Sequence, residues 1–302
     1  MSKGGEVSAV RGVDLTVPRG EFFGLLGPNG AGKSTTIGML TTLVIPTAGA
    51  ATVCGYDVVR QPVAVKRLIG MVSQHNSLDS DLTAIENLEF RGRYFGLGKR
   101  DARRRAESLL ELFDLADRRK ANPFELSGGQ AKRLMICRAL VHRPEVLFLD
   151  EPTAGLDPHT RVNLWKVLRE LQAGGQTILL TTHYMEEAEE LCEQVAIIDH
   201  GAVLASGTVA GLKETSGADT VVTVTYDGPA PEGVHGLKDR PGVQGVETTG
   251  NQARVFTRSA DGLMGELVAI GNDASVGITD ITRTQPSLET AFLSLTGREF
   301  RE

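Results

Sequence analysis

Cysteine is scarce in this sequence, and its distribution excludes a disulfide-built protein. Three cysteines stand among 302 residues, and no two of them form a C-x-x-C pair. The odd number leaves one thiol without a partner, which fits a reducing compartment better than a disulfide scaffold. We therefore expect Cys54, Cys137 and Cys192 to be small apolar side chains of the core.

The sequence also lacks an excess of positive charge and any long apolar run. It carries 32 basic and 38 acidic residues, a net charge of −6, so it has no basic stripe of the kind that a dedicated nucleic-acid binder needs, and we expect no nucleic-acid partner. No apolar run approaches the roughly 18 residues of a spanning helix, and the opening MSKGGEVSAV lacks the pattern of a signal peptide. We expect a cytoplasmic protein that reaches a membrane only through a partner.

Short apolar runs alternate with helical patterns through the first 215 residues. The apolar runs are typical of strands buried in a parallel sheet, and they lie at residues 21–27, 145–152, 176–183 and 195–201. Helical spacing of apolar residues is found at 33–43, 161–172 and 184–194. This alternation predicts an α/β domain over residues 1–215 with a mainly parallel sheet.

Two segments differ from this pattern. Residues 76–141 hold three successive helical patterns and no convincing strand, which predicts a helical insertion into the α/β domain. After residue 215 the expected strands lie at 220–228, 252–258 and 275–284, and the expected helices at 260–271 and 287–297. We therefore predict a small α+β accessory domain over residues 216–302, to which we assign no chemistry.

A glycine-rich loop follows the first expected strand. The segment GPNGAGKST, residues 27–35, matches the phosphate-binding pattern G-x-x-x-x-G-K-[ST] between a strand and a helix. Its glycines let backbone N–H groups converge on phosphate oxygens, and the helix N-terminus and Lys33 add positive charge. The hydroxyl of Ser34 is suited to bind Mg²⁺. The alternative, a glycine-rich turn without a ligand, is disfavoured by the complete motif.

Two carboxylates follow the second expected strand. The segment VLFLDEP places Asp150 and Glu151 at a strand end, where α/β sheets build their sites. Asp150 is suited to the coordination shell of a magnesium ion, and Glu151 to polarise an attacking water as a general base. Either carboxylate could instead cap the next helix.

A second glycine pair stands about a hundred positions after the first loop. Ser127, Gly128 and Gly129 precede a helix expected from about Gln130. Their N–H groups and the Ser127 hydroxyl make another anion site at a positive helix end. Taken alone, the pattern is more typical of an N-cap followed by permissive glycines.

Together these motifs resemble the nucleotide-binding subunit of ABC transporters. The first 210 or so residues carry the motifs of that family in order: GPNGAGKST, a glutamine in MVSQHNSL, LSGGQ, VLFLDEP, AGLD and LLTTHYMEEAE. The resemblance implies a P-loop NTPase fold of the ABC type that binds ATP with Mg²⁺ and hydrolyses the ATP. It also implies a head-to-tail pair, in which each LSGGQ loop closes over the γ-phosphate held by the partner's P-loop.

The resemblance further assigns roles to single residues. Glu151, His183 and Lys33 would be catalytic, with His183 contacting the γ-phosphate and orienting the water, although a lone histidine after a strand is more often structural. Asp157 of AGLD would communicate across the dimer. The metal would be surrounded by Ser34, Gln74 and Asp150. The nucleotide would be bound by Gly27, Pro28, Asn29, Gly30, Ala31, Gly32, Lys33, Ser34, Thr35, Gln74, Ser127, Gly128, Gly129, Gln130 and Asp157.

The position expected to stack on adenine departs from the family pattern. The family has an aromatic residue near the N-terminus on which adenine stacks, whereas the matching position here falls near Gly4. This predicts either weak base recognition or a chain that starts later than its relatives. No N-K-x-D motif that reads guanine is present, which favours ATP.

The glutamates after His183 are interpreted as the solvated face of a helix; they are Glu186, Glu187, Glu189, Glu190 and Glu193.

Two further segments narrow the resemblance to one group of ABC ATPases. They are RGRYFGL at 91–97 and the closing SLETAFLSLTG. They are similar to the ATPase subunits of daunorubicin-type and nodulation-type exporters, whose ABC-2 permease is a separate chain. This implies a motor bound peripherally at the cytoplasmic face of the membrane and paired with a second nucleotide-binding subunit, expected to be a copy of itself. The alternatives are a soluble ABC ATPase acting on a macromolecular partner, a module that binds nucleotide without hydrolysis, and an importer.

Overall fold

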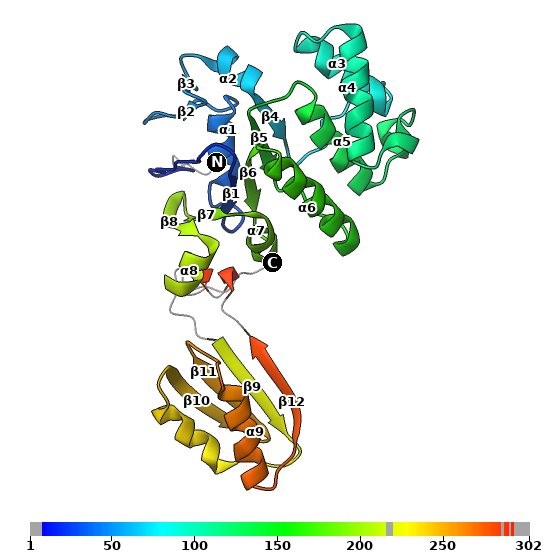
Figure 1. The fold of residues 1–302 in the computed structure, drawn as a ribbon. Helices are drawn as coiled ribbons and strands as arrows, with labels where there is room; N and C mark the ends of the chain where they lie inside the picture. Colours follow the sequence, from blue (N-terminus) through cyan, green and yellow to red (C-terminus); the bar gives the residue numbers. More distant parts are fainter. Residues whose placement is uncertain (1–7, 216–219, 285–286, 290, 293–302) are drawn as a thin grey trace, which may run out of the picture. The chain divides into compact units, whose positions relative to one another are not determined.

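The chain forms two compact units, residues 1–209 and 210–302. The structure, a computed structural model, describes residues 8–215, 220–284, 287–289 and 291–292 (Figure 1). The division expected between residues 215 and 216 falls at the end of helix α8 (Val209–Thr215), and the structural division falls at its beginning. None of the helices in these described ranges has the length and apolar character to cross a bilayer.

A six-stranded sheet in the order β4-β5-β6-β1-β7-β8 forms the centre of the first unit. Its strands are β1 (Phe22–Leu26), β4 (Ile69–Val72), β5 (Val146–Asp150), β6 (Thr177–Thr182), β7 (Gln194–Asp199) and β8 (Ala202–Thr208). All neighbouring strands are parallel except β7 and β8. The predicted α/β class with a mainly parallel sheet is confirmed.

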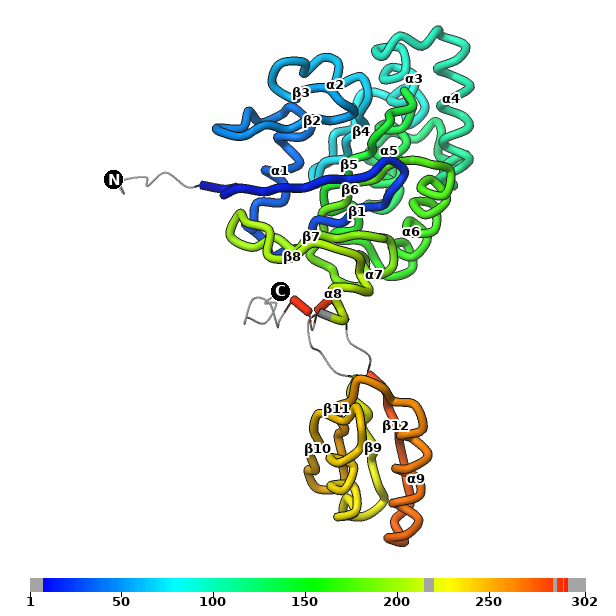
Figure 2. The backbone as a smooth tube through the Cα atoms, turned by 60° about the vertical axis from the view of Figure 1, so that its left-hand side comes forward, coloured from blue at the N-terminus to red at the C-terminus, as the bar shows by residue number. Residues whose placement is uncertain are grey.

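Helices lie around this sheet and, in the case of α3 and α4, beyond its edge (Figures 1 and 2). They are α1 (Lys33–Leu40), α2 (Pro62–Leu68), α3 (Ala84–Tyr94), α4 (Lys99–Leu112), α5 (Gly128–Leu140), α6 (Pro158–Ala173) and α7 (Met185–Leu191), with 3-10 turns η1 (Ala116–Arg118) and η2 (Pro123–Glu125). Residues 76–141, the expected insertion, hold α3, α4 and α5, which pack on one another, and α5 also packs on β4. The helix that begins with the second glycine pair is thereby joined to the edge of the sheet.

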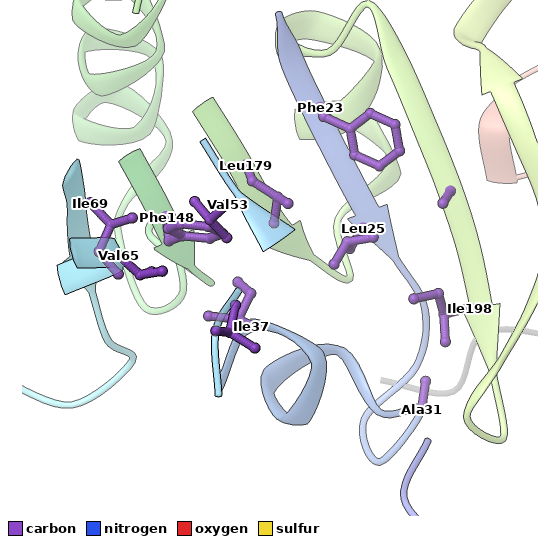
Figure 3. Close-up of a cluster of buried hydrophobic side chains, with 12 residues drawn as sticks. Phe23, Leu25, Ala31, Ile37, Val53, Val65, Ile69, Phe148, Leu179 and Ile198 are labelled. Atoms are coloured by element: carbon purple, nitrogen blue, oxygen red, sulfur yellow. The ribbon is translucent and has the colours of Figure 1, made fainter. Parts of the chain in front are cut away.

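Strand β1 is buried on both faces because successive side chains point to opposite sides of a sheet. Phe23 and Leu25 pack with Ile37 of α1 in one cluster (Figure 3). On the other face Gly24 lies so close to Cys192 that an added Cβ would come within 2.9 Å of the sulfur. This double burial explains why the strand is apolar throughout.

Four strands of the first unit were not predicted. Strand β4 has four residues, and the two-residue strands β2 (Thr52–Val53) and β3 (Tyr56–Asp57) form a separate hairpin. Strand β8 holds only a short apolar stretch, Ala202 to Ala205, followed by small and polar residues, and it is half exposed. The hairpin also corrects the prediction for the cysteines: Cys137 and Cys192 are buried as expected, but Cys54 is exposed in the turn between β2 and β3.

The second unit is an antiparallel sheet in the order β10-β11-β9-β12 with a helix packed against it. Its elements are β9 (Thr220–Tyr226), η3 (Glu232–Asp239), β10 (Val243–Thr249), β11 (Gln252–Thr257), α9 (Leu263–Asp273) and β12 (Ile278–Thr284). Val222, Val224 and Tyr226 alternate along β9 and pack with Leu263 and Leu267 of α9. The order matches a split βαβ motif, with the 3-10 helix η3 in place of its first helix.

Strand β10 and helix η3 were not predicted, because β10 carries glycine and polar residues and is largely exposed. The helix expected at 287–297 falls mostly outside the described residues. Within that range, residues 288–289 and 291–292 are helical.

Candidate functional site

The glycine-rich loop leads from the end of β1 into the first turn of α1. Gly27 passes so close to β7 that an added Cβ would lie 2.1 Å from the carbonyl oxygen of Ile198. Gly32 adopts φ 104°, which glycine reaches without steric cost. Helix α1 has neither a side-chain cap nor an acidic residue in its first turn. Its leading N–H groups and its partial positive charge are therefore left for an anionic ligand.

Lys33 lies buried beneath this loop, with 4% of its surface exposed. Its Nζ donates to the carbonyl oxygens of Gly27 at 2.7 Å and Pro28 at 3.2 Å, and it lies 3.6 Å from Oε1 of Glu151. Burial lowers the pKa of Lys33, and the charge of Glu151 opposes that effect. The ammonium group is thus held between the carbonyls of the loop and a carboxylate.

Asp150, at the end of β5, is bound from two sides. The Ser34 hydroxyl donates to its Oδ1 at 3.1 Å, and the Thr181 hydroxyl donates to the same atom at 2.5 Å. The exposed Ser34 hydroxyl and this carboxylate are hard oxygen donors of the kind that Mg²⁺ prefers. In the described ranges, no three His, Cys, Asp or Glu side chains gather closely enough to hold a metal. The Ser34 hydroxyl and the Asp150 carboxylate fit a magnesium ion that also takes oxygen ligands from phosphates.

Glu151 forms the centre of the cluster. Its Oε1 lies 3.4 Å from Nδ1 of His183, although the two are not aligned for a hydrogen bond. Its Oε2 accepts a hydrogen bond from Nε2 of Gln74 at 3.3 Å. The structure thus brings together Lys33, Gln74, Glu151 and His183, which come from four separate stretches of the sequence. A carboxylate held by a cation and an amide, next to an imidazole, can orient a water molecule and accept its proton.

The backbone of Glu151 is strained. Its φ is 47°, a left-handed conformation that costs a non-glycine residue on the order of 1–3 kcal/mol and that clusters at functional sites. Its N–H donates to both the carbonyl oxygen and the hydroxyl oxygen of Thr181, each at 3.1 Å. Strand β6 therefore helps to hold Glu151 in this conformation.

The second glycine pair begins α5, and the hydrogen bonds described for Ser127 join it to Gln130 and not to the cluster around Glu151. Ser127 caps α5: its Oγ accepts from the N–H of Gln130 at 3.2 Å, and Oε1 of Gln130 accepts from the N–H of Ser127 at 3.0 Å. Ser127 and Gly128 are exposed. The N-cap interpretation is confirmed, and the Ser127 hydroxyl keeps its proton for donation to a ligand.

Asp157 stands at the N-terminus of α6, also outside the cluster. Its Oδ1 accepts from the N–H of Thr160 at 2.9 Å, and hydrogen bonds from Thr160 lower the pKa of this exposed carboxyl. An added Cβ on Gly129 would lie 2.5 Å from Cγ2 of the same Thr160. The glycine pair and Asp157 are therefore neighbours at two adjacent helix N-termini.

Sequence reasoning missed two residues that hold the site. Thr181 lies within LLTTHYMEEAE, but the motif gave it no role, and only the pairing of β5 with β6, which sets Asp150 opposite Thr181, reveals that role. Lys132 of α5 is buried and donates to the carbonyl oxygen of Ser73 at 3.3 Å, next to Gln74. Burial lowers the pKa of Lys132, opposed by the charge of Asp150. Helix α5, which follows the LSGGQ segment, is thus hydrogen-bonded to the loop that contains Gln74 in the same chain.

The acidic run after His183 is not a uniformly solvated face, and the prediction is wrong for Glu187. That residue is 0% exposed, and its Oε1 accepts from Nε1 of Trp165 at 3.1 Å. Burial raises the pKa of the Glu187 carboxyl. The helical period places Glu187 on the buried face with Ala188 and Leu191. The expected adenine-stacking position near Gly4 lies outside the described residues.

Three comparisons place the chain among known proteins. The family model of the ABC transporter matches residues 10–154. The chain is 41% identical to a daunorubicin resistance ATP-binding protein of Streptomyces coeruleorubidus, over 98% of this chain and 94% of that protein. It is 43% identical to a Nod factor export ATP-binding protein I of a Rhizobium species, over 99% of this chain and 95% of the relative.

Solved structures with a similar fold are also ATP-binding cassettes of the ABC type. A dimeric ATP-binding cassette solved in a post-hydrolysis state with ADP and Pi superposes with a TM-score of 0.64, at 29% identity over 69% of this chain and 94% of that one. An ATP-binding subunit of an ABC transporter matches with a TM-score of 0.63, at 34% identity over 69% of this chain and 87% of that one. The loop, the carboxylates and the sheet order are therefore those of a P-loop NTPase, and the chain belongs to the ABC transporter family as an ATP-binding subunit that hydrolyses ATP.

Proposed function

We propose that the chain is the motor subunit of an ABC exporter, in which ATP-driven closure of a dimer is coupled to transport by a separate permease. The observation that carries the proposal is the cluster of Lys33, Gln74, Glu151 and His183 beside an uncapped helix N-terminus. A module that only binds nucleotide needs the loop, but it does not need a carboxylate and an imidazole poised beside it.

In this proposal each residue has a chemical task. Lys33 and the N–H groups of residues 27–35 bind phosphate oxygens. Glu151 accepts the proton of the attacking water, and His183 orients that water toward the γ-phosphate. Ser34 and Asp150, with Gln74, would hold a magnesium ion, which offsets phosphate charge when it is bound.

The LSGGQ loop and Asp157 are proposed to act on a second copy of the chain. Ser127 and Gly128 are exposed at the N-terminus of α5, which is a positive helix end. Because the Ser127 oxygen already accepts from Gln130, its O–H is free to donate to a γ-phosphate held by the partner's loop. A homodimer is favoured since one chain carries both halves of the composite site, and the similar cassette in the post-hydrolysis state is dimeric.

The transport role rests on the named relatives. One relative is a drug-resistance protein and another is a Nod factor export protein, which supports an ABC-2 type permease on a separate chain and a drug-like, lipid or glycan-like substrate. The subunit would then bind peripherally at the cytoplasmic face of the membrane, without a nucleic-acid partner. Residues 216–302 are assigned a packing or dimer-stabilising role. The alternative is an ABC ATPase that acts on a macromolecular partner without a permease.

The test is Mg²⁺-dependent ATPase activity measured against protein concentration at saturating ATP. We expect specific activity to rise steeply with concentration, because two copies form each site. Ser127→Arg should abolish activity while ATP still binds, and Glu151→Gln should trap a closed dimer. Activity that is independent of concentration and survives Ser127→Arg would reduce the second loop to a helix cap. Normal hydrolysis by Glu151→Gln would overturn its assignment as the base.

A further inference from the structure

Helix α6 presents one stripe of side chains to the loop that carries His183. Asp157, Arg161 and Trp165 are spaced four residues apart, which places them on one face of the helix. The guanidinium of Arg161 lies 4.8 Å from the centre of the Tyr184 ring, a separation typical of a cation–π contact. The Trp165 Nε1–H donates to Glu187 at 3.1 Å. The helix capped by Asp157 therefore touches the segment after His183 at two points.

Glu187 lies where three segments of the site meet. Thr182 directly precedes His183, and Thr153 follows Glu151 by two positions; the hydroxyls of both threonines approach the Glu187 carboxyl. In the described part of the chain, Oε2 of Glu187 and Oγ1 of Thr153 are buried without a well-aligned hydrogen bond. One buried carboxyl thus contacts α6, the turn after Glu151 and the strand end before His183.

Such a carboxyl is an expensive way to fill a core position. An incompletely paired buried charge destabilises a fold, and an apolar residue of similar size is often as stable or more stable there. Arg161 offsets part of this cost through its charge. What the carboxyl offers beyond packing is direction, because its Oε1 holds the Trp165 donor of α6 while the hydroxyls of Thr153 and Thr182 lie beside the same carboxyl.

We propose that Glu187 is a positioning residue for ATP hydrolysis: it ties the turn after Glu151 and the segment of His183 to α6, so that the position of Asp157 is passed to His183. Because Glu187 is fully buried, we assign it no direct contact with the nucleotide or the attacking water. Its effect is exerted through the two residues to which the catalytic roles were assigned above, so the inference rests on the proposed function. The imidazole would reach its working position only while α6 is seated against the segment after it.

Three variants test this role. Glu187→Gln keeps the shape and removes the charge, Trp165→Phe removes the N–H donor together with part of the indole ring, and Glu186→Gln makes the same charge change at the exposed neighbouring position as a matched control. For each variant we measure kcat and KM for MgATP, and kcat is divided by the concentration of protein that binds nucleotide. The dissociation constant for ATP and the unfolding curve are determined separately. This normalisation removes the effect of a smaller folded fraction.

We expect kcat to fall at least about tenfold in Glu187→Gln and in Trp165→Phe, the lower end of the effect of losing one hydrogen bond to a charged group. KM and ATP affinity should stay within about twofold, and the double variant should be no slower than the slower single one, because both changes break one contact. Glu186→Gln should match the wild type. If Glu187→Gln fails to fold, Trp165→Phe carries the test.

Wild-type kcat in the folded variants, or losses that multiply in the double variant, would overturn the inference and leave Glu187 with packing alone. Glu151→Gln and His183→Ala serve as references. If both references lose hydrolysis while Glu187→Gln keeps it, only the positioning role fails. If the references retain hydrolysis, the proposed site itself fails.

Discussion

Replacing Thr181 by valine tests how the two carboxylates of the site are held. The Thr181 hydroxyl donates to Asp150 at 2.5 Å and accepts from the N–H of Glu151 at 3.1 Å. Valine keeps the shape and removes both interactions, although Asp150 retains Ser34 and the Glu151 N–H retains the Thr181 carbonyl. The main loss is one hydrogen bond to a charged group, about 1.5–3 kcal/mol. We expect the free energy of unfolding to fall by that amount.

The same loss should appear in catalysis, because both carboxylates move away from their working positions. If it is expressed fully in the transition state, kcat falls roughly 10- to 150-fold. Denaturant unfolding and Mg²⁺-ATPase rates at saturating ATP measure the two effects. Thr177→Val is the matched control: it lies in the same strand, and its buried hydroxyl accepts from the N–H of Gly20 at 2.9 Å, so stability should fall while kcat stays. Near-wild-type stability and kcat in Thr181→Val would refute the reasoning.

Three other changes give distinct outcomes. An added Cβ on Gly128 meets nothing within 4 Å, so Gly128→Ala should leave unfolding unchanged or raise its free energy by up to about 1 kcal/mol, while ATPase activity falls as the methyl group crowds the partner's nucleotide; full activity would speak against a trans role. Asp157→Ala should lower stability in urea because α6 loses its cap, and Asp157→Ser should restore it; an equally stable alanine variant would contradict the cap. Burial raises the pKa of Glu187 above its ordinary 4.5, so the folded state holds this proton more tightly than the unfolded state and the stability of the wild type falls as pH rises above that ordinary value. The stability advantage of Glu187→Gln in unfolding experiments should therefore grow with rising pH until Glu187 is ionised in the folded state; a difference that stays constant with pH would mean that the folded and unfolded pKa values coincide.

The features that the sequence predicts well are local. The loop of residues 27–35 is one continuous motif, and its chemistry follows from adjacent residue types, so the loop and the helix after it could be predicted without any pairing information. The carboxylates Asp150 and Glu151 end an apolar run that can hardly be anything but a buried strand. The α/β class could also be predicted, because the alternation of apolar runs with helical patterns is visible along the sequence without knowledge of strand pairing.

The features that were missed depend on pairing between distant segments. Thr181 reaches Asp150 because β5 and β6 pair in a particular register, and Lys132 reaches the loop of Gln74 because α5 packs on β4. Glu187 was predicted to be solvent-exposed because acidic runs usually form solvated helix faces. Only the packing of α7 against α6 shows which glutamate of α7 is buried. Single-sequence periodicity cannot assign a buried charge to a partner that lies on another element.

The position of β1 in the sheet has a consequence for how the protein is made. This strand, the first of the sheet to leave the ribosome, has no partner until much later, since it lies between β6 and β7 and Leu26 pairs with Thr182 and Ile197. At 5–20 residues per second, roughly 9 to 34 s pass between synthesis of Leu26 and of Ile197. During that interval the apolar FFGLL segment is exposed, which makes the nascent chain a client for holding chaperones. The loop that follows it gains its support only when β7 arrives, so competence to bind ATP should emerge late in translation, after nearly the whole unit has been synthesised.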